Sequence, residues 1–172
     1  MTKLRSKQLM YRLGIGSGSG VIFGVTGGVT EAVLRRLQQG HNRVDMESIK
    51  KSGVRGDDGI KVLTYNYNGR EIKAAVVNGL ANADKVLQQI KNHEAEYDFV
   101  EVMACRRGCI MGGGQPVNAG PRTRKARMKG LYDTDVNTQI KKSNENPMIL
   151  SLYDTLLKGK EHELLHRNFS GK

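Results

Sequence analysis

Cysteine, proline and tryptophan are scarce in this sequence, whose 172 residues include two Cys, three Pro and no Trp. The two cysteines have three residues between them, so a bridge joining them would close a very small loop. No apolar run approaches the roughly 20 residues that a membrane span requires, and the basic start is not followed by the apolar stretch of a signal peptide. These absences predict a soluble, cytoplasmic protein with no membrane contact. Its thiols are then paired metal ligands, a redox pair or two inert buried groups.

Positive charge is abundant, with a formal net charge of +11 that is concentrated at the two ends of the chain. The middle of the chain, which contains both cysteines, is neutral. Basic ends suit an acidic partner or nucleic acid, although a solvated basic surface is the commoner case. The most basic segment, residues 122–129, has no aromatic side chain on which a base could stack, so nucleic acid is poorly supported as a partner.

Hydrophobic periodicity predicts alternating helices and strands. Val29, Val33 and Leu37 recur at helical spacing and indicate a helix over residues 29–37. The dipeptide Asn68-Gly69 is the strongest short signal for a hairpin between two strands. The other expected elements are strands over 61–67, 70–77 and 97–103, helices over 80–90 and 148–157, and a short segment at 161–166.

The composition changes after Pro116, and residues 121–130 are basic, with Gly130 at the end. This change divides the chain into residues 1–120 and 121–172. The second part has too few apolar residues to fold alone, so it should wrap around the first. We therefore expect an α/β fold, with a twisted sheet flanked by helices and a helical C-terminal tail.

Cys105 and Cys109 follow directly on the expected strand over 97–103. If a helical turn starts there, their spacing of i and i+4 would place both sulfurs on one face. Thiolates select iron–sulfur clusters, Zn or Cu(I), and the neighbouring glycines let backbone N–H groups approach sulfide. Two structural thiols beside a flexible loop are the alternative. A cubane cluster takes four protein ligands, and the chain contains two Cys, so half of such a site is present.

Two other patterns are weaker. Gly16-x-Gly-x-Gly20 lacks both the spacing and the preceding strand of a dinucleotide-binding loop, so a tight turn is the better interpretation. His162 and His166 have the i, i+4 spacing of a metal pair, but such residues more often serve packing and hydrogen bonding.

The cysteine segment resembles the third cluster-binding motif of the iron-only (FeFe) hydrogenases. The matching residues are Glu101-Val-Met-Ala, Cys105, Cys109 and Gly112-Gly-Gly-Gln-Pro116. Other segments similar to the family are Phe23–Arg35, Gly59–Lys61, Val77–Ala83, Ser143–Pro147 and Leu164–His166. By this resemblance, residues 1–120 are identified as the C-terminal lobe of the large-subunit catalytic domain, and 121–172 as a small-subunit-like tail.

The resemblance implies a cofactor, the H-cluster. In it a 4Fe–4S cluster is held by four cysteines, one of which bridges to a diiron centre carrying CO, cyanide and a dithiolate. By motif position, Cys105 would be a ligand of the cubane and Cys109 the cysteine shared with the diiron unit. Met103 and Phe23 would be the catalytic residues, as apolar walls beside the diiron centre. The residues expected to bind the cofactor are Gly108, Gly112, Gly113, Gly114 and Gln115.

The sequence departs from the family pattern in two respects. The first two cysteine motifs, with the proton-relay cysteine of the first, are absent. Arg106-Arg107 stands where the family usually has small residues between its cysteines. These guanidiniums could offset the charge of the cluster, raise its potential, face an acidic partner or point to solvent.

The resemblance therefore predicts part of an iron-only hydrogenase, which interconverts protons plus electrons and dihydrogen. Activity would require a complementary hydrogenase chain carrying the other cysteine motifs, and an acidic ferredoxin is a possible electron partner. Two alternatives stay open: a non-enzymatic iron–sulfur relative with an assembly or sensory role, and a homodimer whose two copies share one cubane.

Overall fold

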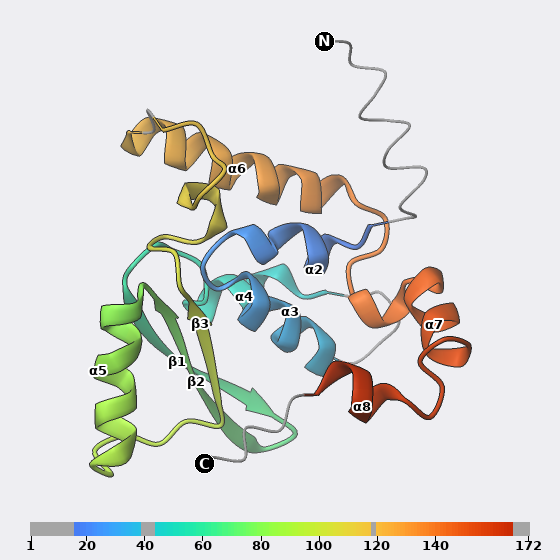
Figure 1. Ribbon diagram of the computed structural model, residues 1–172, viewed down its shortest axis with the longest axis horizontal. Helices are drawn as coiled ribbons and strands as arrows, with labels where there is room; N and C mark the ends of the chain where they lie inside the picture. Colours follow the sequence, from blue (N-terminus) through green and yellow to red (C-terminus); the bar gives the residue numbers. More distant parts are fainter. Residues whose placement is uncertain (1–15, 39–43, 118–119, 167–172) are drawn as a thin grey trace.

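The computed structural model describes residues 16–38, 44–117 and 120–166 (Figure 1). The described part of the chain contains a three-stranded sheet with helices on both faces, which confirms the expected α/β fold class. In chain order the elements are α2 (Gly18–Val21), the 3-10 helix η1 (Ile22–Gly24), α3 (Gly28–Leu37), α4 (Met46–Lys51), β1 (Ile60–Tyr67), β2 (Arg70–Asn78), α5 (Leu80–Lys91), β3 (Phe99–Met103), η2 (Cys109–Met111), α6 (Pro121–Asn137), η3 (Ser143–Glu145), α7 (Pro147–Asp154) and α8 (Glu161–Leu165).

The sheet has the strand order β1-β2-β3. Strands β1 and β2 form the predicted antiparallel hairpin, and its two turn residues, Asn68 and Gly69, have φ values of 51° and 79°. A two-residue loop with positive φ at both positions matches the right-handed twist of the flanking strands. Helix α5 then crosses over to β3, which pairs in parallel with β2. Because β2 is the central strand and is covered on both faces, its residues from 74 to 78 are all buried.

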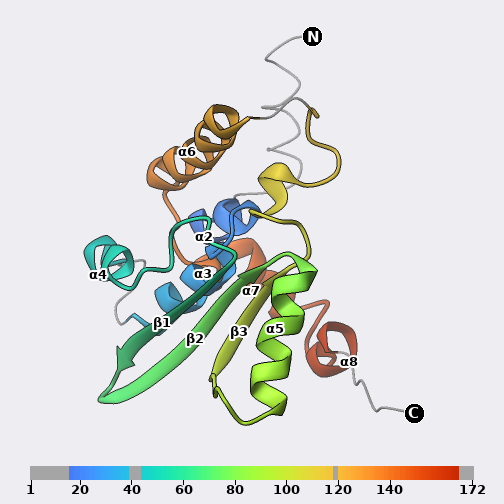
Figure 2. The ribbon, with the colours of Figure 1, turned by 90° about the vertical axis from the view of Figure 1, so that its left-hand side faces the viewer.

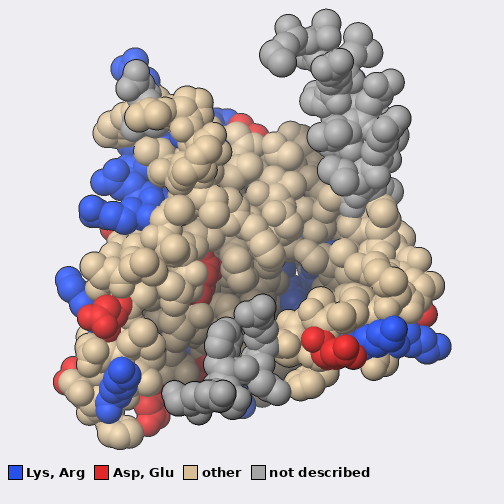
Figure 3. Space-filling view, viewed as in Figure 1, with Lys and Arg blue, Asp and Glu red and all other residues tan. Residues whose placement is uncertain are grey.

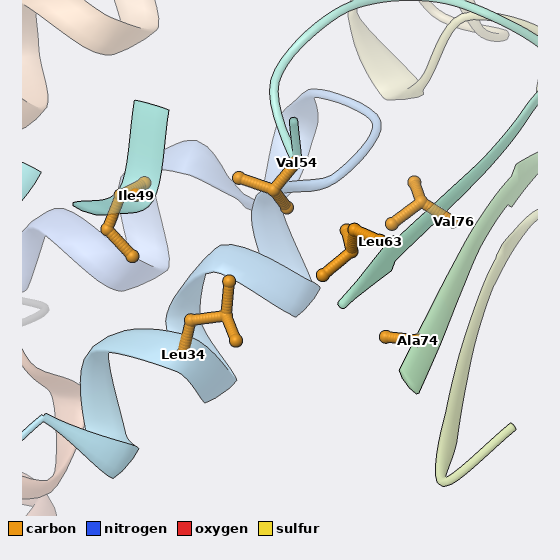
Figure 4. Close-up of a cluster of buried hydrophobic side chains, with 6 residues drawn as sticks. All are labelled: Leu34, Ile49, Val54, Leu63, Ala74 and Val76. Carbon is orange, nitrogen blue, oxygen red and sulfur yellow. The ribbon is translucent and has the colours of Figure 1, made fainter. Parts of the chain in front are cut away.

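The hydrophobic core lies on the two faces of this sheet, whose three strands lie side by side in Figure 2. Figure 1 shows α5 on one side of the strands and the α3–α4 pair on the other. One cluster joins α3, α4 and the loop after α4 to β1 and β2 (Figure 4); it consists of Leu34, Ile49, Val54, Leu63, Ala74 and Val76. The other cluster seats α5 on the opposite face and consists of Ala75, Val77, Ala83 and Val86. Alternate residues of β2 therefore serve different clusters, as the pleat of a strand requires.

Helix α3 forms where periodicity predicts it, but it does not bury the predicted stripe. Val33 is 36% exposed, whereas Glu31, Leu34 and Arg35 are fully or almost fully buried. Burial of Arg35 disfavours its charge, but hydrogen bonds and ion pairs with Asp135 and Glu31 outweigh this cost and raise the pKa of Arg35. Helix α3 therefore turns a charged face inward, because Arg35 finds one partner in Asp135 and another in Glu31 of the same helix.

The ion pair between Arg35 and Asp135, two residues 100 positions apart in the chain, joins α3 to α6. Arg35 donates from Nη1 to Oδ1 and from Nη2 to Oδ2 of Asp135, each over 2.7 Å. Arg35 also donates to Glu31, whose carboxylate accepts two further hydrogen bonds from Arg55. A Cβ at Gly18 would lie 2.0 Å from Asp135 Oδ1, so α2 accommodates the carboxylate only because that residue is glycine.

Helix α6 lies across α2 and η1 (Figure 1) and is continuous from Pro121 to Asn137. The basic stretch of residues 121–130 forms the first part of this helix, which continues through Gly130. Its packing against other elements offsets the roughly 1 kcal/mol that an internal glycine costs. The C-terminal tail is helical, as predicted, and in α7 and α8, which are described in full, no side chain is buried. Within the described residues, no helix is both long and apolar enough to cross a membrane.

Candidate functional site

The two cysteines lie on a loop at the end of β3, and they are not on one helical turn. After Met103 the chain passes through Cys105 into a turn at residues 106–107. Arg107 and Gly108 have φ values of 68° and 88°, which are left-handed, so a right-handed helix cannot continue through them. The short 3-10 helix η2 begins only at Cys109. Cys105 and Cys109 therefore do not share the helical turn that their i, i+4 spacing would allow, because the backbone reverses between them.

The glycine run that follows closes on one of the thiols. A Cβ at Gly112 would lie 2.8 Å from Cys105 Sγ, so the loop reaches this sulfur only with glycine at that position. At Gly113 and Gly114, by contrast, an added Cβ would meet nothing in the described chain within 4 Å, which leaves open space beside the loop. Cys105 is partly buried, Cys109 is exposed, and both are free thiols. Gln115, also expected to bind the cofactor, is exposed.

Asn78, the last residue of β2, fixes the turn between the cysteines. Its Oδ1 accepts a 2.7 Å hydrogen bond from Arg107 N, and its Nδ2 donates to Asp58 O over 2.7 Å and to Thr26 Oγ1. Gly108 packs directly on the turn after η1, where a Cβ would meet Gly24 O and Thr26 N at 2.9 Å each. The cysteine loop is therefore held from two sides by groups far away in the sequence.

Glu101, a buried carboxylate on β3, fixes the turn that leads from η1 into α3 and on which Gly108 packs. Its two oxygens accept hydrogen bonds from Gly27 N, Thr30 N and Thr30 Oγ1 over 2.7–2.8 Å. These groups form the start of α3, where the N-cap residue Gly27 has no side chain to satisfy the free N–H groups. Lys61, whose charge attracts Glu101, donates to Val54 O, and burial lowers the pKa of its amine.

Met103 and Phe23, the two residues expected to form apolar walls, differ in how far they are buried. Met103 is buried at the end of β3, whereas Phe23 lies in η1 and is 44% exposed. The segment containing Phe23 lies beside the cysteine loop, because its neighbour Ile22 packs in one cluster with Ile110 of η2. Helix α6 covers this cluster, and its Arg127 donates a 2.7 Å hydrogen bond to Ile110 O.

Asn78 holds the cysteine loop and Glu101 holds the neighbouring turn before α3, and no role was predicted for either from the sequence. The available signal for Glu101 was a lone carboxylate inside an otherwise apolar strand, Phe99-Val-Glu-Val-Met103. Asn78 stands directly before Gly79, whose N–H donates to Met103 O, and nothing in its local sequence indicates its distant partners.

The donor set fits part of an iron–sulfur site. Two thiols lie on one loop, Gly112 leaves room for the sulfur of Cys105, and there is open space beside Gly113 and Gly114. Among the described residues, no group of three or more His, Cys, Asp or Glu is placed to hold a metal. His162 and His166 stack on each other in the α8 region, with ring centroids 5.0 Å apart. The described chain thus offers two soft ligands of a cluster that takes four.

Comparison with known proteins gives consistent results along the chain. Residues 1–113 match the family model of the iron only hydrogenase large subunit, C-terminal domain, and residues 121–172 match that of the iron hydrogenase small subunit. Iron hydrogenase 1 of Clostridium pasteurianum is 36% identical over 174 residues, covering 95% of this chain and 30% of the relative. A solved FeFe-hydrogenase HydA1 variant from Chlamydomonas reinhardtii has a TM-score of 0.59 and 34% identity, covering 90% of this chain and 47% of that one.

A more distant relative is a probable cytosolic Fe-S cluster assembly factor of Aedes aegypti, which is 27% identical over 84% of this chain and 31% of its own length. The chain spans less than a third of these two curated relatives and less than half of the solved hydrogenase. The family models and the hydrogenase relative agree with the motif around Cys105 and Cys109, and the chain belongs to the iron-only hydrogenase family.

Proposed function

We propose that this chain forms part of an iron-only hydrogenase domain and supplies Cys105 and Cys109 as two of the four protein ligands of a 4Fe–4S cluster. The observation that carries the proposal is the closure of the glycine loop on Cys105, where a Cβ at Gly112 would lie 2.8 Å from the sulfur. The sequence contains no third cysteine, so the remaining thiolates come from outside these 172 residues. We assign them to a complementary hydrogenase polypeptide that carries the other cysteine motifs.

When bound, the H-cluster would supply the redox chemistry that interconverts protons plus electrons and dihydrogen. In this proposal Cys105 would hold the cubane, and Cys109 would be the ligand that also serves the diiron centre. Met103 and Phe23 would exclude water beside a bound diiron centre. Gly108 and the run Gly112–Gln115 bring backbone close to the cluster. The described fold contributes rigidity, because Asn78 and Glu101 hold the loop and the neighbouring turn.

The test is anaerobic reconstitution of the complex between this chain and its complementary polypeptide. We expect iron and sulfide in the ratio of the H-cluster, a cubane signal in electron paramagnetic resonance, and infrared bands of metal-bound CO and cyanide. Cys109→Ser should abolish those infrared bands, because an alkoxide is a harder and more basic donor than a thiolate. Cys105→Ser should weaken the cubane. Ala104→Ser, which adds a hydroxyl beside Cys105 and removes no thiol, is the matched control.

Retention of the infrared bands in Cys109→Ser would show that the bridging role is misassigned. The isolated chain should produce no dihydrogen after the same reconstitution, because it supplies only two thiolates. Dihydrogen evolution by the isolated chain would contradict the need for a complementary polypeptide.

A second candidate function is suggested by the relative that is named as an iron–sulfur assembly factor. In that case the complex would hold a cubane, and no diiron unit would be attached at Cys109. The same infrared experiment separates the two functions. A wild-type complex with a cubane signal and no CO or cyanide bands, even after diiron insertion is attempted, would favour the assembly role.

A further inference from the structure

The cysteine loop borders a polar cavity of about 300 Å³, whose lining includes Arg106 and Arg107, the two residues that follow Cys105. The cavity lies where β2 and β3 end, the edge at which α/β sheets usually bind ligands. Its charged lining consists of three guanidiniums and two carboxylates, from Arg106, Arg107, Arg124, Asp57 and Asp58. Figure 3 shows Lys and Arg side chains gathered on the surface between α6 and the upper end of α5.

The three guanidiniums that line the cavity have N–H donors without a hydrogen-bond partner in the described residues. Within the described chain, neither Arg106 nor Arg107 makes a side-chain hydrogen bond or ion pair, and both are exposed. Arg124 forms an ion pair with Asp57, but its buried Nε has no hydrogen-bond partner in the described residues. Each guanidinium has five N–H donors in a planar fork that matches carboxylate and phosphate oxygens. The cavity therefore combines a net positive charge with unused donors.

The backbone holds two of these side chains at the rim. Arg107 has a left-handed φ of 68°, and Asn78 Oδ1 accepts the hydrogen bond from its N–H. Arg106 packs its Cγ on Gly79, where a Cβ would come within 2.9 Å. Both arginines are therefore fixed at their base by contacts with the end of β2, and their guanidiniums line the same cavity.

We propose that this cavity binds a small oxyanion, a phosphate or carboxylate group, between Arg106, Arg107 and Arg124. Asp57 pairs with Arg124, and with Asp58 also in the lining the three guanidiniums leave the cavity a net charge of +1, which suits a single anionic group. The cluster is not needed for this binding, since every residue that lines the cavity is in place in the chain alone. Failure of cluster assembly would therefore leave the anion site untouched, so the two proposals can fail separately.

The experiment is isothermal titration calorimetry of the full 172-residue chain, without metal, against inorganic phosphate and against succinate at constant ionic strength. We expect saturable binding of at least one of these probes. Arg106→Gln and Arg107→Gly should each weaken it by about tenfold, as expected for the loss of one charge-assisted hydrogen bond. Glycine at residue 107 removes the guanidinium and also suits the left-handed backbone, so this variant keeps the fold.

Arg122→Gln is the matched control, because Arg122 is exposed on the same helix as Arg124 and does not line the cavity. Its affinity should equal that of the wild type. Tighter binding of phosphate would assign the site to a phosphate-bearing molecule, and tighter binding of succinate would assign it to a carboxylate. Absence of binding of both probes at millimolar concentration would overturn the proposal. So would an equal loss in Arg122→Gln, which would indicate only a response to net charge.

Discussion

Replacement of Asp135 by asparagine removes one carboxylate from the buried ion pair between α3 and α6 and leaves the side-chain volume almost unchanged. Arg35 and Asp135 are 0% and 2% exposed, so the remaining guanidinium stays away from water. Arg35 then keeps only Glu31, which it shares with Arg55. One carboxylate would face two guanidiniums.

The magnitude follows from the burial of the pair. Removal of one partner of a buried ion pair costs about 3–5 kcal/mol, because the other charge is left uncompensated. We expect the lower end, about 3 kcal/mol, since Glu31 still contacts Arg35. For a chain of this size, roughly 2–4 °C of melting temperature corresponds to each kcal/mol, so Asp135→Asn should melt about 6–12 °C below the wild type.

The assay is urea and thermal unfolding of the metal-free chain, followed by circular dichroism. Asp133→Asn is the matched control on the same helix, because Asp133 pairs with Lys129 at a site where the side chains are 55% and 75% exposed. An exposed pair of this kind contributes at most about 0.5 kcal/mol. Equal losses in Asp133→Asn and Asp135→Asn would refute the reasoning that burial makes the Arg35–Asp135 pair important.

Three further substitutions test the site and its support. Glu101→Gln should cost roughly 1–3 kcal/mol in urea unfolding, because the amide cannot accept all three hydrogen bonds that the carboxylate accepts; an unchanged midpoint would contradict the capping role. Gly112→Ala places a methyl group 2.8 Å from Cys105 Sγ and should slow labelling of that thiol by a maleimide, whereas Gly113→Ala, which meets open space, should not. Burial raises the pKa of Tyr132 from 10.0 to about 12, so the stability it contributes is present below pH 10.0 and lost as pH rises through about 12. Over that range Tyr132→Phe should lose about 2–3 kcal/mol less than the wild type in urea unfolding, and parallel pH profiles would exclude this linkage.

Local signals in the sequence were sufficient for much of the sheet. The hairpin at Asn68-Gly69 depends on two residues that tolerate positive φ, and the structure has positive φ at both. Helix α5 and strand β3 begin and end within a few residues of their predicted bounds, because their patterns are read from consecutive side chains. Short-range chemistry determines these elements, so a single sequence contains the information.

Long-range contacts explain what the sequence did not indicate. Helix α6 continues through Gly130 because other elements hold the residues on either side of that glycine. Arg127 donates a hydrogen bond to Ile110 O, and Asp135 accepts one from Arg35. The buried face of α3 carries charge for the same reason, since Arg35 meets its partner on α6. Hydrophobic periodicity assumes that apolar residues face inward, and a buried ion pair violates that assumption.

In the candidate site, too, local sequence signals predicted one part and long-range contacts determine the other. The motif located Cys105 and Cys109, but it gave no indication of the reversed turn between them, which depends on Asn78 at the end of another strand. The turn after η1 packs against Gly108, and Arg127 on α6 holds the carbonyl of Ile110. The contacts from these three segments hold the loop through its backbone, so they do not depend on a bound cluster. The fold therefore places the two cysteines, and we expect substitutions of the supporting residues to weaken the proposed cluster site although they remove no cysteine.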